Sequence, residues 1–290
     1  METQQPVARI VVGPASAPAL VLLHGITGSA VSQSEAISHW ARAGYRVIAL
    51  DARGHGLSPR WSPEQLARAG EVLVDDVVAA LSEIEAERSA RLAAALPAPA
   101  VPPVLIGHSM GGATAMVVAA RHPELVAGAV LCDPARYGQR SPAELLARGE
   151  ARRRALESEL ADLPAALSRS LASDSVPHAE AAAGVWASQH MDPALLGTGV
   201  VAPEVPWLEA MAELRMPTLL VTGDRPGAAR VGAQGLAAVE ALGHANVTTA
   251  LGHANVTTAL VPGAGHDVRR SRPEGFYAAV DPWLAQVLPA

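Results

Sequence analysis

A serine flanked by glycines stands where an apolar stretch of this sequence gives way to a run of small residues. Ser109 lies in Gly107-His108-Ser109-Met110-Gly111, after the apolar residues 104–106 and before the small residues 113–121. This order of strand, sharp turn and helix is the context that a Gly-x-Ser-x-Gly nucleophile elbow requires. So tight a turn strains the backbone at the serine toward positive φ, and side chains two residues before and after it would collide. We therefore expect Ser109 to act as a nucleophile.

A serine nucleophile needs a base, which must come from elsewhere in the chain. His266 is the best placed of the ten histidines. It follows the last apolar run, at 256–261, in a Gly-Ala-Gly-His loop that leaves room for the backbone. It also completes the chain order serine, acid, histidine that is known for such sites. His266 is therefore the expected base.

The elements that must position these residues are predicted to be alternating strands and helices. A short strand is expected at 9–12, and continuous apolar runs alternate with helical patterns at 19–23, 45–50, 104–106, 126–131, 217–222 and 256–261. Continuous apolar runs are typical of strands that are buried on both faces. The alternation predicts an α/β fold with a mostly parallel, doubly wound sheet.

One segment breaks this alternation. Residues 137–213 are rich in Ala, Leu, Arg, Glu and Pro and contain no candidate strand. We expect several helices there, inserted between two strands of the sheet. The expected organisation is one core domain, formed by residues 1–136 and 214–290, with a helical cap at 137–213.

Composition limits the classes of partner and compartment. The chain has 290 residues, half of them hydrophobic, which is enough for one large α/β domain. The net charge is −6 and no basic face is evident, so nucleic acid is not an expected partner. The single cysteine, Cys132, excludes an internal disulfide. The start lacks the pattern of a signal peptide, and no apolar run has membrane-spanning length. We expect a cytoplasmic protein without a membrane partner, as a monomer or homodimer.

Nine residues are repeated in tandem near the end of the chain. Residues 241–249, Ala-Leu-Gly-His-Ala-Asn-Val-Thr-Thr, recur unchanged at 250–258. The second copy can supply the strand that leads to His266. We therefore expect the first copy to be extruded as a longer surface connection, at a small entropic cost. No role is predicted for His244 or His253, and no metal site is expected.

Together these motifs resemble the α/β-hydrolase superfamily over nearly the whole chain. The matching pieces are His24-Gly25, Asp51-Ala52-Arg53-Gly54-His55-Gly56-Leu57-Ser58, Gly107-His108-Ser109-Met110-Gly111-Gly112, Asp133-Pro134, Thr222-Gly223-Asp224 and Pro262-Gly263-Ala264-Gly265-His266. Their combination is highly specific for the superfamily but not for any substrate. The resemblance implies the α/β-hydrolase fold, and residues 137–213 look like the lid that such enzymes insert after the sixth strand.

The resemblance leaves the acid of the expected triad open between two aspartates. Members of the family usually place it after the seventh strand with the spacing Gly-x-x-Asp, but Pro226 occupies that position here. Asp224 directly follows the glycine, close to the end of the sheet. A minority of members place the acid after the sixth strand, where Asp133 stands. We favour Asp133 and retain Asp224 as the alternative.

The resemblance also assigns the donors of an oxyanion hole. The backbone N–H groups of Met110, directly after the nucleophile, and of Ile26, in the loop after His24-Gly25, are the expected pair. Side chains under the cap would line the substrate pocket. Three tryptophans are candidates for this lining: Trp61, Trp186 and Trp207.

Other charged residues are expected to be structural. Asp51, Arg53 and His55 should brace the loop beside the site rather than react, with Arg53 paired to a carboxylate. The three consecutive arginines 152–154 are expected to form a solvated face of the cap rather than an anion site.

The expected function is hydrolysis of a small-molecule carboxylic ester or lactone through an acyl-enzyme intermediate, without cofactor or metal. Serine at the elbow, rather than aspartate, argues against epoxide hydrolase and haloalkane dehalogenase chemistry. The same triad would serve a C–C bond hydrolase, a thioester hydrolase or a cofactor-free perhydrolase. A non-catalytic ligand-binding receptor of the same fold is the alternative from a different class.

Overall fold

The computed structural model describes residues 5–136, 141–242 and 256–288 of the chain. Its centre is a seven-stranded sheet in the order β1-β3-β2-β4-β5-β6-β7. All pairs are parallel except β1 with β3. The strands are β1 (Arg9–Val12), β2 (Ala19–Leu23), β3 (Arg46–Leu50), β4 (Val104–His108), β5 (Gly128–Cys132), β6 (Thr218–Gly223) and β7 (Val256–Val261). The predicted α/β fold with a mostly parallel sheet is confirmed.

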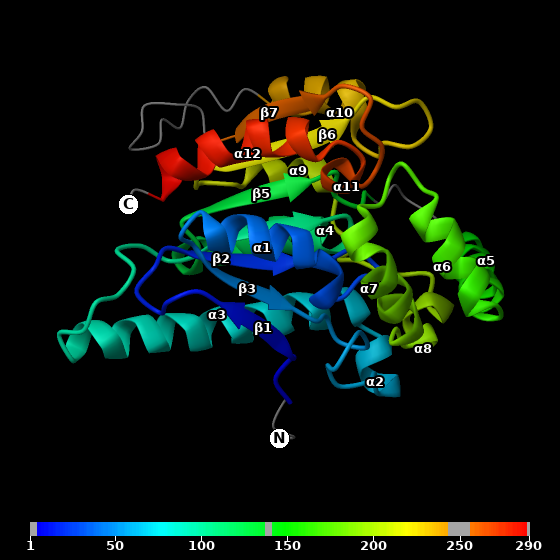
Figure 1. Ribbon diagram of the computed structural model, residues 1–290, viewed down its shortest axis with the longest axis horizontal. Helices are drawn as coiled ribbons and strands as arrows, with labels where there is room; N and C mark the ends of the chain where they lie inside the picture. Colours follow the sequence, from blue (N-terminus) through cyan, green and yellow to red (C-terminus); the bar gives the residue numbers. More distant parts are fainter. Residues whose placement is uncertain (1–4, 137–140, 243–255, 289–290) are drawn as a thin grey trace.

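Helices cover both faces of this sheet (Figure 1). On one face lie α1 (Ser34–Arg42) and α12 (Pro273–Val287), and on the other lie α3 (Ala69–Ala93), α4 (Met110–Arg121) and α10 (Gly232–Glu240). Strand side chains alternate between the two faces: in β4, Leu105 joins one buried cluster, and Val104 and Ile106 join the other. Burial on both faces explains the continuous apolar runs in the sequence.

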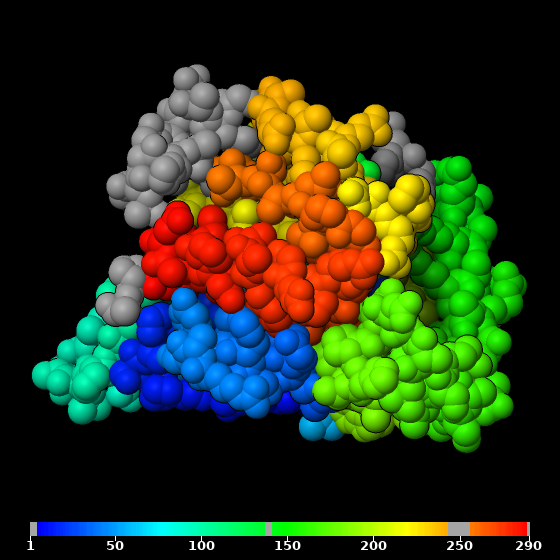
Figure 2. All heavy atoms as spheres, turned by 45° about the horizontal axis from the view of Figure 1, so that its top comes forward, coloured from blue at the N-terminus to red at the C-terminus, as the bar shows by residue number. Residues whose placement is uncertain are grey.

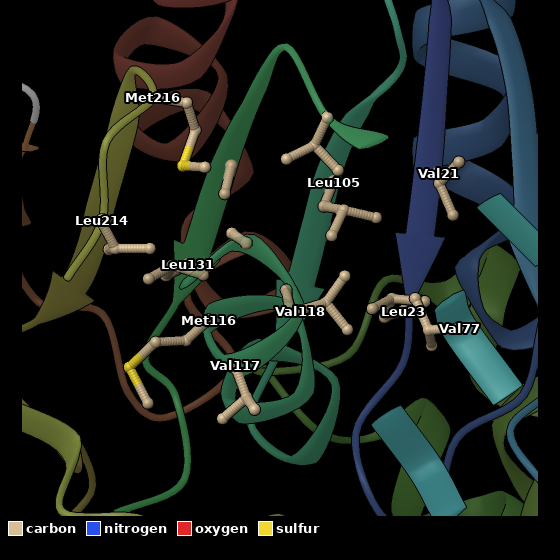
Figure 3. Packing of buried hydrophobic residues seen from close by; sticks show 14 of the residues in the cluster. Val21, Leu23, Val77, Leu105, Met116, Val117, Val118, Leu131, Leu214 and Met216 are labelled. Atoms are coloured by element: carbon tan, nitrogen blue, oxygen red, sulfur yellow. The ribbon is translucent and has the colours of Figure 1, made fainter. Parts of the chain in front are cut away.

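Helix α4 is packed at the centre of one of these clusters (Figure 3). Its residues Met116, Val117 and Val118 lie in the same buried cluster as Leu105 of β4 and Leu131 of β5. Close-packed interiors leave little room for displacement. The turn between β4 and α4, which carries the candidate nucleophile, is therefore held by two elements with fixed positions.

Between β5 and β6, the described part of the chain forms helices and loops only. We call residues 141–213 the inserted segment; its helices are α5 (Pro142–Leu160), α6 (Leu163–Leu171), α7 (His178–Gln189), α8 (Pro193–Gly197) and α9 (Trp207–Ala212). The arrowheads of the parallel strands point toward α5–α8, which lie together at one end of the molecule (Figure 1). In Figure 2 the atoms of this part of the chain, coloured green, gather at the same end. This places α5–α8 at the carboxyl ends of the strands, whereas α9 packs with α4 in a buried cluster on one face of the sheet. The remaining short helices are η1 (Val31–Gln33), α2 (Pro63–Leu66), η2 (Pro123–Leu125) and α11 (Val268–Ser271).

A buried ion-pair cluster attaches α7 to the rest of the molecule. The Oε2 atom of Glu180, a fully buried side chain, lies 2.8 Å from Arg269 Nη2 and 2.8 Å from Arg270 Nε. Its Oε1 accepts a hydrogen bond of 3.0 Å from the backbone N–H of Glu35. Burial disfavours the charged form of Arg269, but Glu180 and Asp267 raise the pKa of its guanidinium above the ordinary value. The inserted segment is thus anchored by charge as well as by apolar packing.

The tandem duplication leads directly into the last strand. β7 begins at Val256, within the second copy, as predicted. The register of β7 on β6 pairs Val256 with Thr218 and Val261 with Gly223. Most of the first copy, together with His244 and His253, lies outside the described residues, so its extrusion stays a prediction. Among the described helices, none combines the length and the apolarity needed to cross a bilayer.

Candidate active site

Ser109 occupies the sharp turn between β4 and α4. Its backbone has φ 53° and ψ −111°, in the left-handed half of conformational space that residues with a side chain rarely adopt. A Cβ on Gly107 would lie 2.3 Å from the carbonyl oxygen of Gly111, and a Cβ on Gly111 would lie 2.3 Å from that of Leu23. The predicted positive φ and the predicted need for glycine at both positions are confirmed.

A chain of hydrogen bonds links Ser109 to a buried carboxylate. The Nε2 atom of His266 lies 2.8 Å from the Oγ of Ser109, and its Nδ1 lies 2.6 Å from Oδ2 of Asp133. An ionised carboxylate can only accept hydrogen bonds, so Nδ1 carries the proton and Nε2 presents its lone pair to the serine hydroxyl. In this arrangement a histidine can take the hydroxyl proton of a serine nucleophile.

The surroundings of Asp133 favour its ionised form. Its Oδ1 accepts hydrogen bonds from Thr222 Oγ1 at 2.6 Å and from the backbone N–H of Val231 at 2.8 Å, and its Oδ2 accepts one from the N–H of Arg230 at 2.8 Å. Burial alone would raise the pKa of this carboxyl. The hydrogen bonds from His266, Thr222 and the two amides outweigh burial and lower the pKa below its ordinary value of 3.8.

Asp224, the alternative acid, lies elsewhere. It is exposed, and its Oδ1 accepts a hydrogen bond of 2.6 Å from the backbone N–H of Gly263, which joins the loops after β6 and β7. The structure thus brings Asp133, and not Asp224, to His266. The strand order gives the reason: Asp133 follows β5, the neighbour of β4, whereas Asp224 follows β6, one strand further from Ser109.

The loop after β2 is held by hydrogen bonds with the loop after β3. The Oδ1 atom of Asp51 accepts a hydrogen bond of 2.7 Å from a backbone amide of this loop, and Nε2 of His55 lies 2.6 Å from the carbonyl oxygen of Ile26. Arg53 forms a buried pair with Asp76, with two N–H···O bonds of 2.9 and 2.8 Å. The structural contacts expected of this motif, including the pairing of Arg53 with a carboxylate, are present.

Ile26 and Met110 lie with Ser109 and His266 around one cavity of about 620 Å³. In the part of the chain that the structure describes, the backbone N–H groups of Ile26 and Met110 have no hydrogen-bond partner. Amide donors that are free and adjacent to a nucleophile are what an oxyanion hole requires. Donation by these two groups to a substrate oxygen remains a prediction.

Two further histidines line a smaller cavity, of about 180 Å³, that also reaches Ser109. The ring of His24 accepts a hydrogen bond of 3.0 Å at Nε2 from the N–H of Ala52 and donates one of 2.7 Å from Nδ1 to the carbonyl oxygen of Gly25. Burial lowers the pKa of His24 to about 3 and that of His108 to about 4, from 6.5. Both rings are therefore neutral at pH 7.

The three candidate tryptophans occupy three different environments. Trp207 lines the 620 Å³ cavity, where its ring centroid lies 5.0 Å from Cζ of Arg136. Trp61 is 8 % exposed and fills the space between the loop after β3 and the inserted segment. Trp186 stacks on His190 with ring centroids 3.9 Å apart. Trp61 and Trp186 are not part of the lining of this cavity, so only Trp207 is placed as expected.

Four arginines that the sequence analysis did not assign to the site line the same cavity: Arg136, Arg148, Arg152 and Arg230. Arg153 and Arg154 do form a charged outer face of α5, paired with Glu150. Arg152 differs because it shares a helix face with Arg148, four residues earlier. That spacing was the available signal, whereas Arg136 and Arg230 stand in loops without one.

Over residues 5–136, 141–242 and 256–288, no group of three or more His, Cys, Asp or Glu side chains is arranged to hold a metal ion. The chemistry available beside Ser109 is that of a nucleophile, a base, a carboxylate and amide donors.

Comparison with known proteins is consistent with the geometry. The family model described as alpha/beta hydrolase fold matches residues 18–185. The sn-1-specific diacylglycerol lipase of Mus musculus is 38% identical over 122 residues, which cover 42% of this chain and 34% of that protein. Epoxide hydrolase B of Mycobacterium tuberculosis is 36% identical over 113 residues, 39% of this chain and 28% of that protein. The match therefore spans about a third of the length of these relatives.

Solved structures share the fold over almost the full length. The enol-lactonase from Burkholderia xenovorans superposes with a TM-score of 0.69 at 18% identity and covers 96% of both chains. A putative aryl esterase from Burkholderia cenocepacia also has a TM-score of 0.69, at 19% identity, over 98% of this chain and 96% of that chain. At these identities the likeness concerns the fold alone.

Proposed function

The chain belongs to the alpha/beta hydrolase fold family, and from that premise we propose that it is a serine hydrolase that cleaves a carboxylic ester or a lactone. The observation that supports this proposal is the hydrogen-bonded series Ser109, His266 and Asp133 at the edge of the 620 Å³ cavity. The inserted segment is proposed to act as a cap, because Arg148 and Arg152 of α5 line that cavity together with Ser109 and His266.

In the proposed acylation, the Oγ of Ser109 attacks the carbonyl carbon of the substrate while Nε2 of His266 takes the hydroxyl proton. Asp133 stabilises the imidazolium that forms and keeps the ring in place. The backbone N–H groups of Ile26 and Met110 donate to the oxyanion, and each such donor contributes about 3 kcal/mol in the transition state. Collapse of the tetrahedral intermediate breaks the ester bond, and the leaving alkoxide receives the proton from His266.

Deacylation repeats these steps with water as the nucleophile. His266 takes a proton from the water molecule as it attacks the acyl group on Ser109. Collapse of the second tetrahedral intermediate releases the carboxylic acid and returns the proton to Ser109. Every proton moves through His266, so the proposed reaction needs no further acid or base.

The test is turnover of a series of p-nitrophenyl acyl esters, from acetate to octanoate, by the wild type and by Ser109→Ala. Loss of the nucleophile is expected to lower kcat by about 10⁶-fold. Ser82→Ala is the matched control, because Ser82 is exposed on α3 and its hydroxyl donates to the carbonyl oxygen of Val78, far in sequence from the elements that carry Ser109 and His266. The control should turn over each ester at the wild-type rate.

Two outcomes would contradict the proposal. Equal residual turnover by the wild type and by Ser109→Ala, with both proteins folded, would exclude ester hydrolysis at this serine. Tight retention of an ester without turnover would instead indicate the receptor alternative.

A further inference from the structure

The charged side chains that line the 620 Å³ cavity beside Ser109 are all of one sign. Its lining includes Arg136, Arg148, Arg152 and Arg230, and no aspartate or glutamate among the described residues. The stretches outside the described residues that are closest in sequence to this lining, 137–140 and 243–255, contain no Asp or Glu either. Among the described residues, the lining of the candidate substrate cavity thus carries four arginines and no carboxylate, although the net charge of the chain is −6.

The guanidinium of Arg136 is kept in position by contacts with Arg230 and Trp207. Its Nη2 donates to the carbonyl oxygen of Arg230, and its guanidinium lies over the ring of Trp207. It is partly buried, and burial lowers the pKa of the guanidinium from its ordinary value while Asp133 opposes that effect. Within the described chain, Arg136 and Arg230 form no ion pair with a carboxylate. A partly desolvated cation is costly unless an anion compensates it.

The arginines of α5 lie on two different faces of the helix. Arg153 lies 2.8 Å from Glu150 and 2.6 Å from Glu157, so its charge is compensated on the outer face. Arg148 and Arg152 are one helical turn apart and line the cavity. The arginines that line the cavity therefore come from two parts of the chain: Arg136 and Arg230 from the core, and Arg148 and Arg152 from the inserted segment.

We propose that the substrate carries a negatively charged oxyanion group, a carboxylate or a phosphate, in addition to the ester or lactone that is cleaved. The arginines bind this group while the scissile carbonyl lies at Ser109. The planar fork of a guanidinium suits bidentate hydrogen bonds to either anion. This inference rests on the proposed function and narrows its substrate class.

The experiment compares esters of one acyl length that differ only in the terminal group. The probes are mono-p-nitrophenyl adipate, its methyl ester, and a p-nitrophenyl hexanoate with a terminal phosphate. In the wild type, kcat/KM for one charged probe should exceed that for the methyl ester by about tenfold to a hundredfold, the range of a charge-assisted hydrogen bond. Whichever charged probe is preferred identifies the anion. A neutral probe that is turned over equally well or better overturns the inference and leaves the serine-hydrolase proposal standing.

Substitutions on α5 test which residues cause the preference for the charged probe. In Arg152→Gln the ratio of charged to neutral kcat/KM should fall by several-fold, and in Arg152→Glu it should fall further, while three arginines remain in the lining. Arg153→Gln, one residue along the same helix, is the matched control and should keep the wild-type ratio. The wild-type ratio should also fall as NaCl is raised, because salt screens charge, and this readout needs no variant.

A binding measurement separates the two proposals if no ester is cleaved. Adipate, or hexanoate with a terminal phosphate, should raise the Tm of the folded wild type. The increase should be smaller in Arg152→Gln and unchanged in Arg153→Gln. Such an increase supports the anion site even where ester hydrolysis fails. No increase with either ligand overturns the site.

Discussion

The hydrogen bonds around Asp133 and Asp224 predict unequal effects of the same substitution. Asp133→Asn replaces the acceptor for His266 Nδ1–H by an amide that cannot stabilise the imidazolium, and kcat should fall by about 10⁴-fold. Asp224→Asn keeps an acceptor oxygen for the N–H of Gly263, and kcat should change by less than about threefold. The measurement is kcat with the best p-nitrophenyl ester, with circular dichroism as the check on folding. A larger loss in Asp224→Asn would show that the resting geometry is not the reacting one.

Single candidate catalytic residues could be predicted from the sequence where one short motif contains them. Ser109 was found from five residues, and His266 from chain order and loop composition. The acid stayed open because spacing along a loop does not report which strand lies beside β4. Asp133 reaches His266 because β5 neighbours β4 and because Thr222 and Val231, distant in sequence, donate to its carboxylate.

The position of the cavity arginines could not be predicted from the sequence. A helical repeat places Arg148 and Arg152 on one face of α5, but the repeat does not say which face turns toward the sheet. That orientation depends on how the inserted segment packs on the core. Arg136 and Arg230 meet only because the loops after β5 and β6 lie side by side.

At the scale of elements, two glycines in helices should respond oppositely to alanine. A Cβ at Gly111 would lie 2.3 Å from the carbonyl oxygen of Leu23 and 2.7 Å from that of His24, both on a backbone that cannot move away easily. Gly111→Ala should lower the free energy of unfolding by about 2–3 kcal/mol, as overpacking does, and should displace Ser109. Gly184, inside α7, has nothing within 4 Å of such a Cβ. Gly184→Ala should raise the free energy of unfolding by about 0.5–1 kcal/mol.

Urea unfolding of both variants is the measurement, with ester turnover alongside. If Gly111→Ala were as stable and active as the wild type, the elbow would tolerate a wider turn than its contacts indicate. A loss of stability in Gly184→Ala would mean that α7 is packed on that side as well.

Element types were predictable because each buried strand is a continuous apolar run. The apolar run at 104–106 lies in β4, Val104–His108, and the run at 256–261 is β7. The packing of the inserted segment was not predictable. A glutamate on a helix usually faces solvent, yet Glu180 is fully buried between Arg269 and Arg270. Its partners lie 89 and 90 residues away, and no local pattern points to them.

At the scale of the whole molecule, buried neutral histidines make stability depend on pH. The pKa of His24 is lowered by burial to about 3 and that of His108 to about 4, whereas both are near 6.5 in the unfolded chain. Below about pH 6.5 the unfolded state binds protons that the folded state does not, so the free energy of unfolding should fall as the pH falls. The slope should reach about 1.4 kcal/mol per pH unit for each ring. Urea unfolding at pH 7.5, 6.0 and 5.0 measures it, and a flat profile would contradict the burial of both rings as neutral species.

The tandem duplication predicts that one copy is dispensable for fold and site. Fifteen residues, 241–255, separate α10 from β7, and deletion of 241–249 leaves six, within the usual range of about 2–6 for such connections. Because the copies are identical, β7 keeps its sequence from Val256 and its register on β6, and His266 keeps its distance from β7. Shortening the connection should raise Tm by about 2 °C and leave kcat/KM within about twofold of the wild type. Deletion of both copies, 241–258, removes three residues of β7 and should abolish folding. Thermal unfolding and ester turnover of the two deletions test this directly, since an inactive or unfolded single-copy protein would mean that the first copy contributes contacts of its own.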